Sequence, residues 1–253
     1  MQAVKLSRYL LPGEIAQRRI ILDKITAVFV KYGYQEIITP AFEAFDELSP
    51  ALPVALYEAA FRFFDHSGTQ MILRPDIKTQ VARIVSTRLK QEKGPLKLFY
   101  SGDVYRARQR EIGQGNQFHQ IGIELFDVGP AGDKEVIKIM TECLKAVGLV
   151  NFSIEQTNVS KINSLPPDKK KALLAQDFVA LGRLPNKEEL LSVDIDYYTG
   201  LYFECFVPEM GYVLGSGGRY DNLCEKFGKS RKAVGFAFNL DKLIQALAKQ
   251  KGN

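Results

Sequence analysis

The sequence of 253 residues lacks the features that mark membrane-spanning, secreted and disulfide-stabilised proteins. No apolar run reaches the roughly 18 residues that indicate a membrane helix, and the first residues lack the apolar core of a signal peptide. The three cysteines, Cys143, Cys205 and Cys224, have no metal-ligand spacing, and their odd number argues against a disulfide framework. We therefore expect a soluble cytoplasmic protein with buried, unpaired cysteines.

Histidine is scarce and the net charge is small. The two histidines, His66 and His119, are too few and too far apart to predict a metal site or a catalytic triad. The net charge of +5, from 34 basic and 29 acidic residues, does not by itself indicate nucleic-acid binding. We expect no metal and no cofactor. The chain does have 46% apolar residues, which is enough to bury one large core.

The hydrophobic patterns predict strands joined by loops and hairpins, with helices at a few places. A helical period follows Pro12-Gly13 and ends at Tyr32-Gly33. Because strands and helices do not alternate regularly, the pattern favours an α+β fold with a mainly antiparallel sheet flanked by helices, in one core domain over residues 1–253. A small insertion at about 151–190 should hold a strand and one or two short helices. The other expected helices are 77–90, 132–147 and one starting at Asn239, and the expected strands are 34–40, 61–65, 70–73, 96–100, 105–108, 117–126, 212–214 and 232–238.

Acidic, tyrosyl and glycine residues gather in two β-rich runs, 194–204 and 215–221. Such groups on a pleated surface can hold a small zwitterion, and the glycines of the second run should let sheet and ligand approach closely. In the expected strand 117–126, Gln120 and Glu124 share one face by the two-residue period, while His119 points to the other face. A carboxylate beside a carboxamide suits a ligand with one cation and an imidazole.

Several segments resemble the histidyl-tRNA synthetase family of class II aminoacyl-tRNA synthetases. The segment VDIDYYTG with FE at 203–204, and the segment GSGGRYD at 215–221, resemble the two histidine-specific signatures of these enzymes and of their catalytically silent relatives. Residues 12–40 resemble motif 1, which builds the dimer interface, residues 106–120 resemble motif 2, and residues 233–243 resemble motif 3. The resemblance covers the chain from Pro12 to Leu243, except for residues 151–190.

The resemblance implies an amino-acid pocket. In the family, the residue at Arg106 binds the α-phosphate and the amino-acid carboxylate, since a guanidinium can bridge two anions. The residue at Glu124 contacts the imidazole and the α-amino side of the ligand. Asp76 replaces a glutamate of the synthetases and matches the aspartate of the silent relatives, and it also suits a cap for the helix that follows. The implied histidine-binding residues are Asp76, Arg106, Gln120, Glu124, Tyr197 and Tyr198.

Other positions depart from the synthetase pattern. Val193 stands in place of an arginine, Arg108 in place of the glutamate that recognises adenine, and Lys242 in place of the motif 3 arginine that packs on adenine. Lys78 stands where threonine is expected. Removing one donor from a site of developing phosphate charge costs on the order of 3 kcal/mol of transition-state stabilisation. The amino-acid side is therefore kept while the ATP side is lost.

This combination resembles the regulatory subunits of short-form ATP phosphoribosyltransferases, which are paralogues of histidyl-tRNA synthetase. The resemblance implies a protein without a catalytic site that activates the short catalytic subunit and transmits feedback inhibition by L-histidine in the first step of histidine biosynthesis. It also implies a dimer within a hetero-octamer, and no tRNA binding. The chain ends about ten residues after motif 3, so we expect no anticodon-binding domain.

Two alternatives stay open at this point. One is a divergent or truncated histidyl-tRNA synthetase core that still forms histidyl-adenylate. The other is a stand-alone histidine-binding or RNA-binding module. The sequence also leaves open which surface meets the catalytic subunit, and whether histidine binds in this pocket or at a subunit interface.

Overall fold

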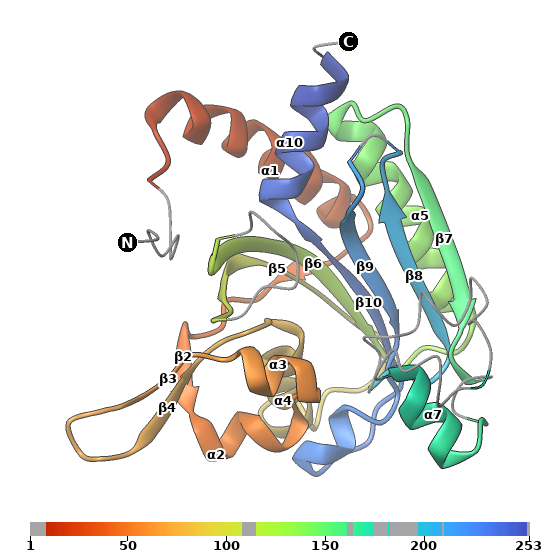
Figure 1. The fold of residues 1–253 in the computed structure, drawn as a ribbon. Coiled ribbons are helices and arrows are strands. Elements are labelled where there is room, and N and C mark those ends of the chain that lie inside the picture. Colours follow the sequence, from red (N-terminus) through yellow and green to blue (C-terminus); the bar gives the residue numbers. More distant parts are fainter. Residues whose placement is uncertain are drawn as a thin grey trace.

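A seven-stranded sheet forms the centre of the molecule (Figure 1). Only β1 runs parallel to its neighbour, and all other neighbouring pairs are antiparallel. The expected α+β fold with a mainly antiparallel sheet is therefore confirmed. In spatial order the strands are β1 (Gln35–Glu36), β5 (Leu96–Tyr105), β6 (Gln117–Phe126), β10 (Ala233–Asn239), β9 (Val213–Arg219), β8 (Leu201–Phe206) and β7 (Ser153–Asn158). This computed structural model describes residues 9–107, 115–160, 164–174, 182, 197–208 and 210–251.

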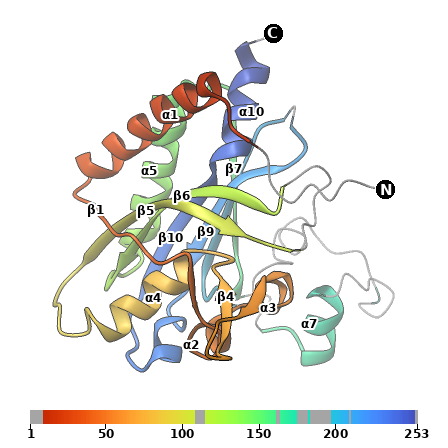
Figure 2. The same cartoon turned by 90° about the vertical axis from the view of Figure 1, so that its left-hand side faces the viewer.

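Three helices cover one face of the sheet: α1 (Pro12–Lys31), α5 (Ala131–Val147) and α10 (Leu240–Lys251). Figures 1 and 2 show them on the same side. The helices cover this face because alternate side chains of the strands that point toward it are apolar. In β6, Ile121 and Ile123 point toward the helices, and both are fully buried. Among the described residues, the largest apolar core lies between this sheet face and the helices.

The other sheet face is covered by shorter elements. The helix α4 (Lys78–Thr87) packs there, and its Val81 and Val85 belong to a second apolar core with strands β5 and β6. A three-stranded sheet, in the order β2-β4-β3, lies beside it with the short helices (Figure 1). The remaining elements are β2 (Phe42–Ala44), β3 (Arg62–Phe64), β4 (Gln70–Leu73), α2 (Phe45–Leu48), α3 (Val54–Ala59), α7 (Pro167–Leu174), and the 3-10 helices η1 (Ser49–Ala51) and η2 (Cys224–Phe227).

Most of the expected elements are confirmed. The first helix, the hairpin of β3 and β4, and the strand 117–126 lie where the patterns predict them. The expected break between strands 96–100 and 105–108 is wrong, because β5 continues through Gly102 and pairs with β6 along its whole length. A Cβ at Gly102 would lie 2.6 Å from Arg74 Nη2, so a larger residue there would require the Arg74 guanidinium to shift. Residue 108 lies outside the described residues.

The expected strand 34–40 is shorter than predicted. Only Gln35 and Glu36 pair as a strand, with β5. The backbone that follows bonds to side chains instead of to a neighbouring strand: the Thr39 carbonyl accepts a hydrogen bond from Arg74, and the Pro40 carbonyl accepts one from Gln80. A side-chain contact of this kind leaves no trace in the periodicity of the sequence.

Within the expected insertion at 151–190, the structure describes residues 151–160, 164–174 and 182. Its predicted strand exists as β7, which forms the edge of the large sheet and pairs with β8. Its predicted helix exists as α7. The three cysteines are buried and unpaired, as expected. Within the described ranges, no helix combines the length and apolar character that crossing a membrane requires.

Gly235 in β10 lies directly opposite Glu124 in β6, and a Cβ there would overlap Glu124 Oε2 and the Ile123 carbonyl oxygen. We expect Gly235→Ala to lower the free energy of unfolding by about 2–3 kcal/mol, as overpacking of a tight core does. Urea denaturation measures this change. Gly129→Ala is the control, because no atom lies within 4 Å of the added methyl group. Equal unfolding midpoints for the two variants would contradict the packing argument.

Candidate functional site

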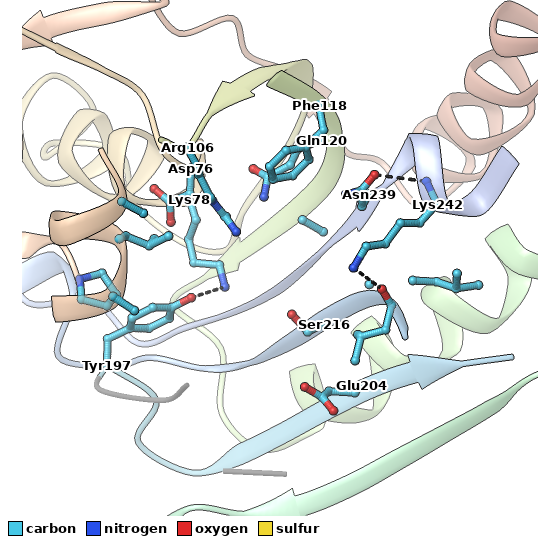
Figure 3. Close-up of a pocket in the computed structure, with 18 of the residues that line it drawn as sticks. Asp76, Lys78, Arg106, Phe118, Gln120, Tyr197, Glu204, Ser216, Asn239 and Lys242 are labelled. Atoms are coloured by element: carbon cyan, nitrogen blue, oxygen red, sulfur yellow. Dashed lines mark hydrogen bonds between the residues drawn. The ribbon is translucent and has the colours of Figure 1, made fainter. Parts of the chain in front are cut away.

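A cavity of about 300 Å³ opens on the sheet face opposite α1 and α5. Strands β5, β6, β8, β9 and β10 contribute to it, together with α3, the start of α4 and the segment before β8. The structure brings together five of the six expected histidine-binding residues in its lining, and Figure 3 shows several of their side chains pointing inward. These five residues are Asp76, Arg106, Gln120, Tyr197 and Tyr198.

The sixth expected residue, Glu124, lies behind the cavity wall. It is fully buried, and its two carboxylate oxygens are already used: Tyr100 donates to Oε1 at 3.0 Å, and Tyr220 donates to Oε2. Burial raises the pKa of Glu124 to about 7, against the opposing effects of the Lys78 charge and the two tyrosine hydrogen bonds. Glu124 thus influences the cavity through Tyr100, which does line it, and through Lys78.

Lys78, at the start of α4, is a buried cation in the cavity wall. Only 6% of the residue is exposed, and its ammonium donates to Tyr198 Oη at 2.9 Å and to Tyr197 Oη at 3.2 Å. Burial by itself would lower the pKa of Lys78, but the pKa lies above its ordinary value because Tyr197, Tyr198 and Glu124 face the ammonium. Sequence reasoning noted this lysine only as a departure from threonine and missed its position.

Asp76 and Arg106 are both fixed by the backbone around them. Asp76 Oδ1 accepts from the Thr79 amide at 3.4 Å, as a helix cap does, while the side chain also lines the cavity. Arg106 Nε donates to the Pro75 carbonyl at 2.9 Å, and its guanidinium lies 5.0 Å from the centre of the Phe118 ring. The cap role and the cavity position of Asp76 therefore coexist.

Gln120 is the least satisfied group of the cavity. Its side chain lines the cavity from β6 (Figure 3), and its Oε1 is buried without a hydrogen-bond partner among the described residues. A buried acceptor without a partner costs about 1–3 kcal/mol. A ligand that donates an N–H group at this place would remove that cost.

The three expected departures from the synthetase pattern have different outcomes. Val193 and Arg108 lie outside the described residues. Lys242 lines the cavity, where its ammonium donates to the Val213 carbonyl at 3.1 Å and lies 5.1 Å from the centre of the Tyr212 ring (Figure 3). Its charge is therefore directed to the protein's own backbone.

The residues at 219–221 hold the cavity wall in place. Arg219 donates to Asp133 and to the carbonyl oxygens of Val128 and Gly129, which joins β9 to the start of α5. Tyr220 donates to Glu124, and the Asp221 carboxylate accepts from the Ala233 amide at 2.9 Å. This segment therefore acts through structure, since these three residues do not line the cavity.

His119 lies on the sheet face opposite Glu124, as expected. Its Nε2 lies 2.8 Å from Ser101 Oγ and its Nδ1 lies 2.7 Å from Asp103 Oδ1. The hydrogen bond with His119 lowers the pKa of Asp103. The His119 amide donates to Asp241 at the start of α10, and Asp241 also pairs with Arg18 of α1 at 2.8 Å. This Ser-His-Asp arrangement connects the sheet to two helices, and sequence reasoning missed it.

Comparison with known proteins agrees with this architecture. The family model described as histidyl-tRNA synthetase matches residues 7–175 and 190–243. The chain is 33% identical to the ATP phosphoribosyltransferase regulatory subunit of Thermoanaerobacter pseudethanolicus, over 95% of this chain and 81% of that protein. It is 30% identical to the protein of the same name from Carboxydothermus hydrogenoformans, over 94% of each chain.

Solved structures give the same result. The chain is similar to an ATP phosphoribosyltransferase regulatory subunit/histidyl-tRNA synthetase from Bacillus halodurans C, with a TM-score of 0.78 and 27% identity over 96% of this chain and 82% of that one. It is also similar to apo S. aureus histidyl-tRNA synthetase, with a TM-score of 0.77 and 25% identity over 99% of this chain and 71% of that one.

The fold is of the class II aminoacyl-tRNA synthetase type. Within this class, the chain belongs to the histidyl-tRNA synthetase-like family of ATP phosphoribosyltransferase regulatory subunits. The family that the motifs indicated is thereby confirmed.

Glu124 should make the stability of the protein depend on pH. Its folded-state pKa of about 7 exceeds the ordinary value of 4.5, so between these values the folded state keeps a proton that the unfolded state has lost. The stabilisation is full below pH 4.5 and is lost as the pH rises through 7. Relative to Glu124→Gln, which cannot titrate, the wild type should lose roughly 3 kcal/mol over this range. Urea denaturation across the range tests this, and parallel pH profiles would contradict it.

Proposed function

We propose that this chain is the regulatory subunit of a short-form ATP phosphoribosyltransferase and has no catalytic site of its own. It activates the catalytic subunit and transmits feedback inhibition by L-histidine in the first step of histidine biosynthesis. It acts in the cytoplasm as a dimer within a hetero-octamer and does not bind tRNA. The name that its relatives carry at 30% and 33% identity supports the partnership with the catalytic subunit.

The unsatisfied Gln120 acceptor is the observation that carries the histidine part of this proposal. The cavity around it is of the size that small-molecule sites have, and it combines carboxylate and cationic side chains in its wall. An amino acid with an imidazole brings an ammonium, a carboxylate and a ring N–H group. Such a ligand can donate to Gln120 while Arg106 faces its carboxylate.

The side chain and the hydrogen bond of Lys242 support the absence of catalysis. A lysine has no planar surface to pack on adenine, and this one already uses its ammonium on the Val213 carbonyl. The substitutions at Val193 and Arg108 argue in the same direction from the sequence. Because preorganised cations around the α-phosphate provide much of the catalysis of adenylate formation, their loss leaves a site suited to binding.

Two assays on the purified chain test the regulatory role. Alone, it should give no histidine-dependent exchange of pyrophosphate into ATP, and when added to a short-form ATP phosphoribosyltransferase it should raise the rate of that enzyme. Histidine should then inhibit the mixture. Robust exchange by the chain alone would identify an active synthetase core instead. Absence of both exchange and stimulation would identify a stand-alone binding module.

Gln120→Leu should weaken histidine binding by about 1–2 kcal/mol, roughly tenfold, because it removes the acceptor while keeping a similar volume. Isothermal titration calorimetry measures this change. Gln91→Leu is the matched control, because Gln91 is exposed and does not line the cavity. Unchanged affinity in Gln120→Leu would show that histidine binds elsewhere, for example at a subunit interface.

A further inference from the structure

Three tyrosine rings surround the ammonium of Lys78. The ring centres of Tyr197, Tyr198 and Tyr220 lie 5.0, 4.8 and 5.0 Å from Nζ. We call these three residues the tyrosine cage. Tyr197 and Tyr198 also accept hydrogen bonds from the ammonium, and Figure 3 shows the lysine reaching across the cavity wall to Tyr197.

The tyrosine cage has the chemistry of a cation site. Aromatic ring faces attract cations within about 6 Å, and cages of this kind recognise ammonium groups of ligands. No carboxylate of the described residues forms an ion pair with Lys78 within 4 Å, so the rings and hydroxyls hold the ammonium directly. The Glu124 carboxylate, which accepts a hydrogen bond from Tyr220, also raises the pKa of Lys78 through its negative charge.

We propose that Lys78 is an internal competitor of the ligand: its ammonium fills the cation subsite beside Tyr197 and Tyr198, where a primary ammonium or an imidazolium group of the ligand would otherwise lie. Lys78, Tyr197 and Tyr198 line the same cavity as the unsatisfied Gln120 acceptor, and the fully buried Tyr220 closes the cage on the side away from the cavity. A ligand cation therefore displaces the lysine ammonium when it enters. Asp76, two residues earlier in the chain and also in the cavity wall, offers a carboxylate to the displaced ammonium.

This competition sets the concentration at which the ligand acts. The apparent dissociation constant equals the intrinsic dissociation constant divided by the fraction of molecules in which Lys78 has left the cage. Only the identity of the ligand as histidine rests on the proposed function. The cation subsite itself rests on the geometry of Lys78 and the tyrosine cage.

Chemical rescue tests the subsite. Lys78→Ala removes the equivalent of n-propylammonium and leaves Glu124 without its compensating cation, so the melting temperature should fall. Added n-propylammonium chloride should raise the melting temperature of Lys78→Ala by several degrees in a concentration-dependent way. The wild type should not respond. Potassium chloride at equal ionic strength and 1-propanol, which has nearly the same size without the charge, should not rescue the variant.

Two control variants separate the cage from general effects. Lys78→Met fills the cage with an uncharged chain, so n-propylammonium should not raise its melting temperature. Lys134→Ala removes an exposed lysine of α5 and should behave as the wild type. Absence of rescue in a folded Lys78→Ala, or equal rescue of Lys78→Met, would overturn the cation subsite.

Histidine titrations test the competition. In calorimetry, Lys78→Ala should bind histidine at least about tenfold more tightly than the wild type, because the competitor is absent. Equal or weaker binding by Lys78→Ala would overturn the competition. Amine rescue without histidine binding by either protein would keep the cation subsite and refute histidine as its ligand, so the two failures are distinguishable.

Lysine labelling of the wild type tests the same displacement without any substitution. Reductive methylation followed by peptide mass spectrometry should leave Lys78 unmodified under conditions that modify Lys134. Saturating histidine should make Lys78 reactive. A Lys78 that reacts as fast as Lys134 without histidine, or one that stays protected while histidine is bound, would overturn the proposal.

Discussion

The buried carboxylate of Glu124 is the constraint on which the cavity side of the sheet depends. A carboxylate inside a protein must be neutralised or hydrogen-bonded. Here Tyr100 and Tyr220 donate to its two oxygens, Lys78 faces it with a positive charge, and Gly235 leaves the space it fills. Because these groups come from four separate segments, the carboxylate fixes the positions of α4, β5, β10 and the segment after β9 relative to β6.

The opposite sheet face is organised by apolar packing and by a second polar group. The helices α1, α5 and α10 bury the largest core there. At its edge, His119 joins Asp103 and Ser101 of β5, and Asp241 connects this group to α1 and α10. The helices hold one face of the sheet, and the other face presents a cavity lined by side chains of five strands together with α3, the start of α4 and the segment before β8.

The charges of the cavity explain why a synthetase-like core suits regulation. Two of its cations are engaged by the protein itself, Lys242 by a backbone carbonyl and Lys78 by the tyrosine cage. Gln120 is left with an acceptor that no described residue satisfies. Under the proposed competition, a ligand would bind at the cost of rearranging Lys78 and would change the charge distribution of the cavity wall.

The sequence by itself determined the fold class, the family and most elements, because periodicity and motif spacing are local properties. It also indicated five residues that line the cavity: the strand period pointed to Gln120, and the motifs pointed to Asp76, Arg106, Tyr197 and Tyr198. Only the tertiary structure decided that Glu124 lies behind the wall and that Lys78 fills the tyrosine cage. Those outcomes depend on burial and on contacts between residues distant in the sequence, such as Lys78 with Tyr198 and Glu124 with Tyr220, which no local pattern encodes.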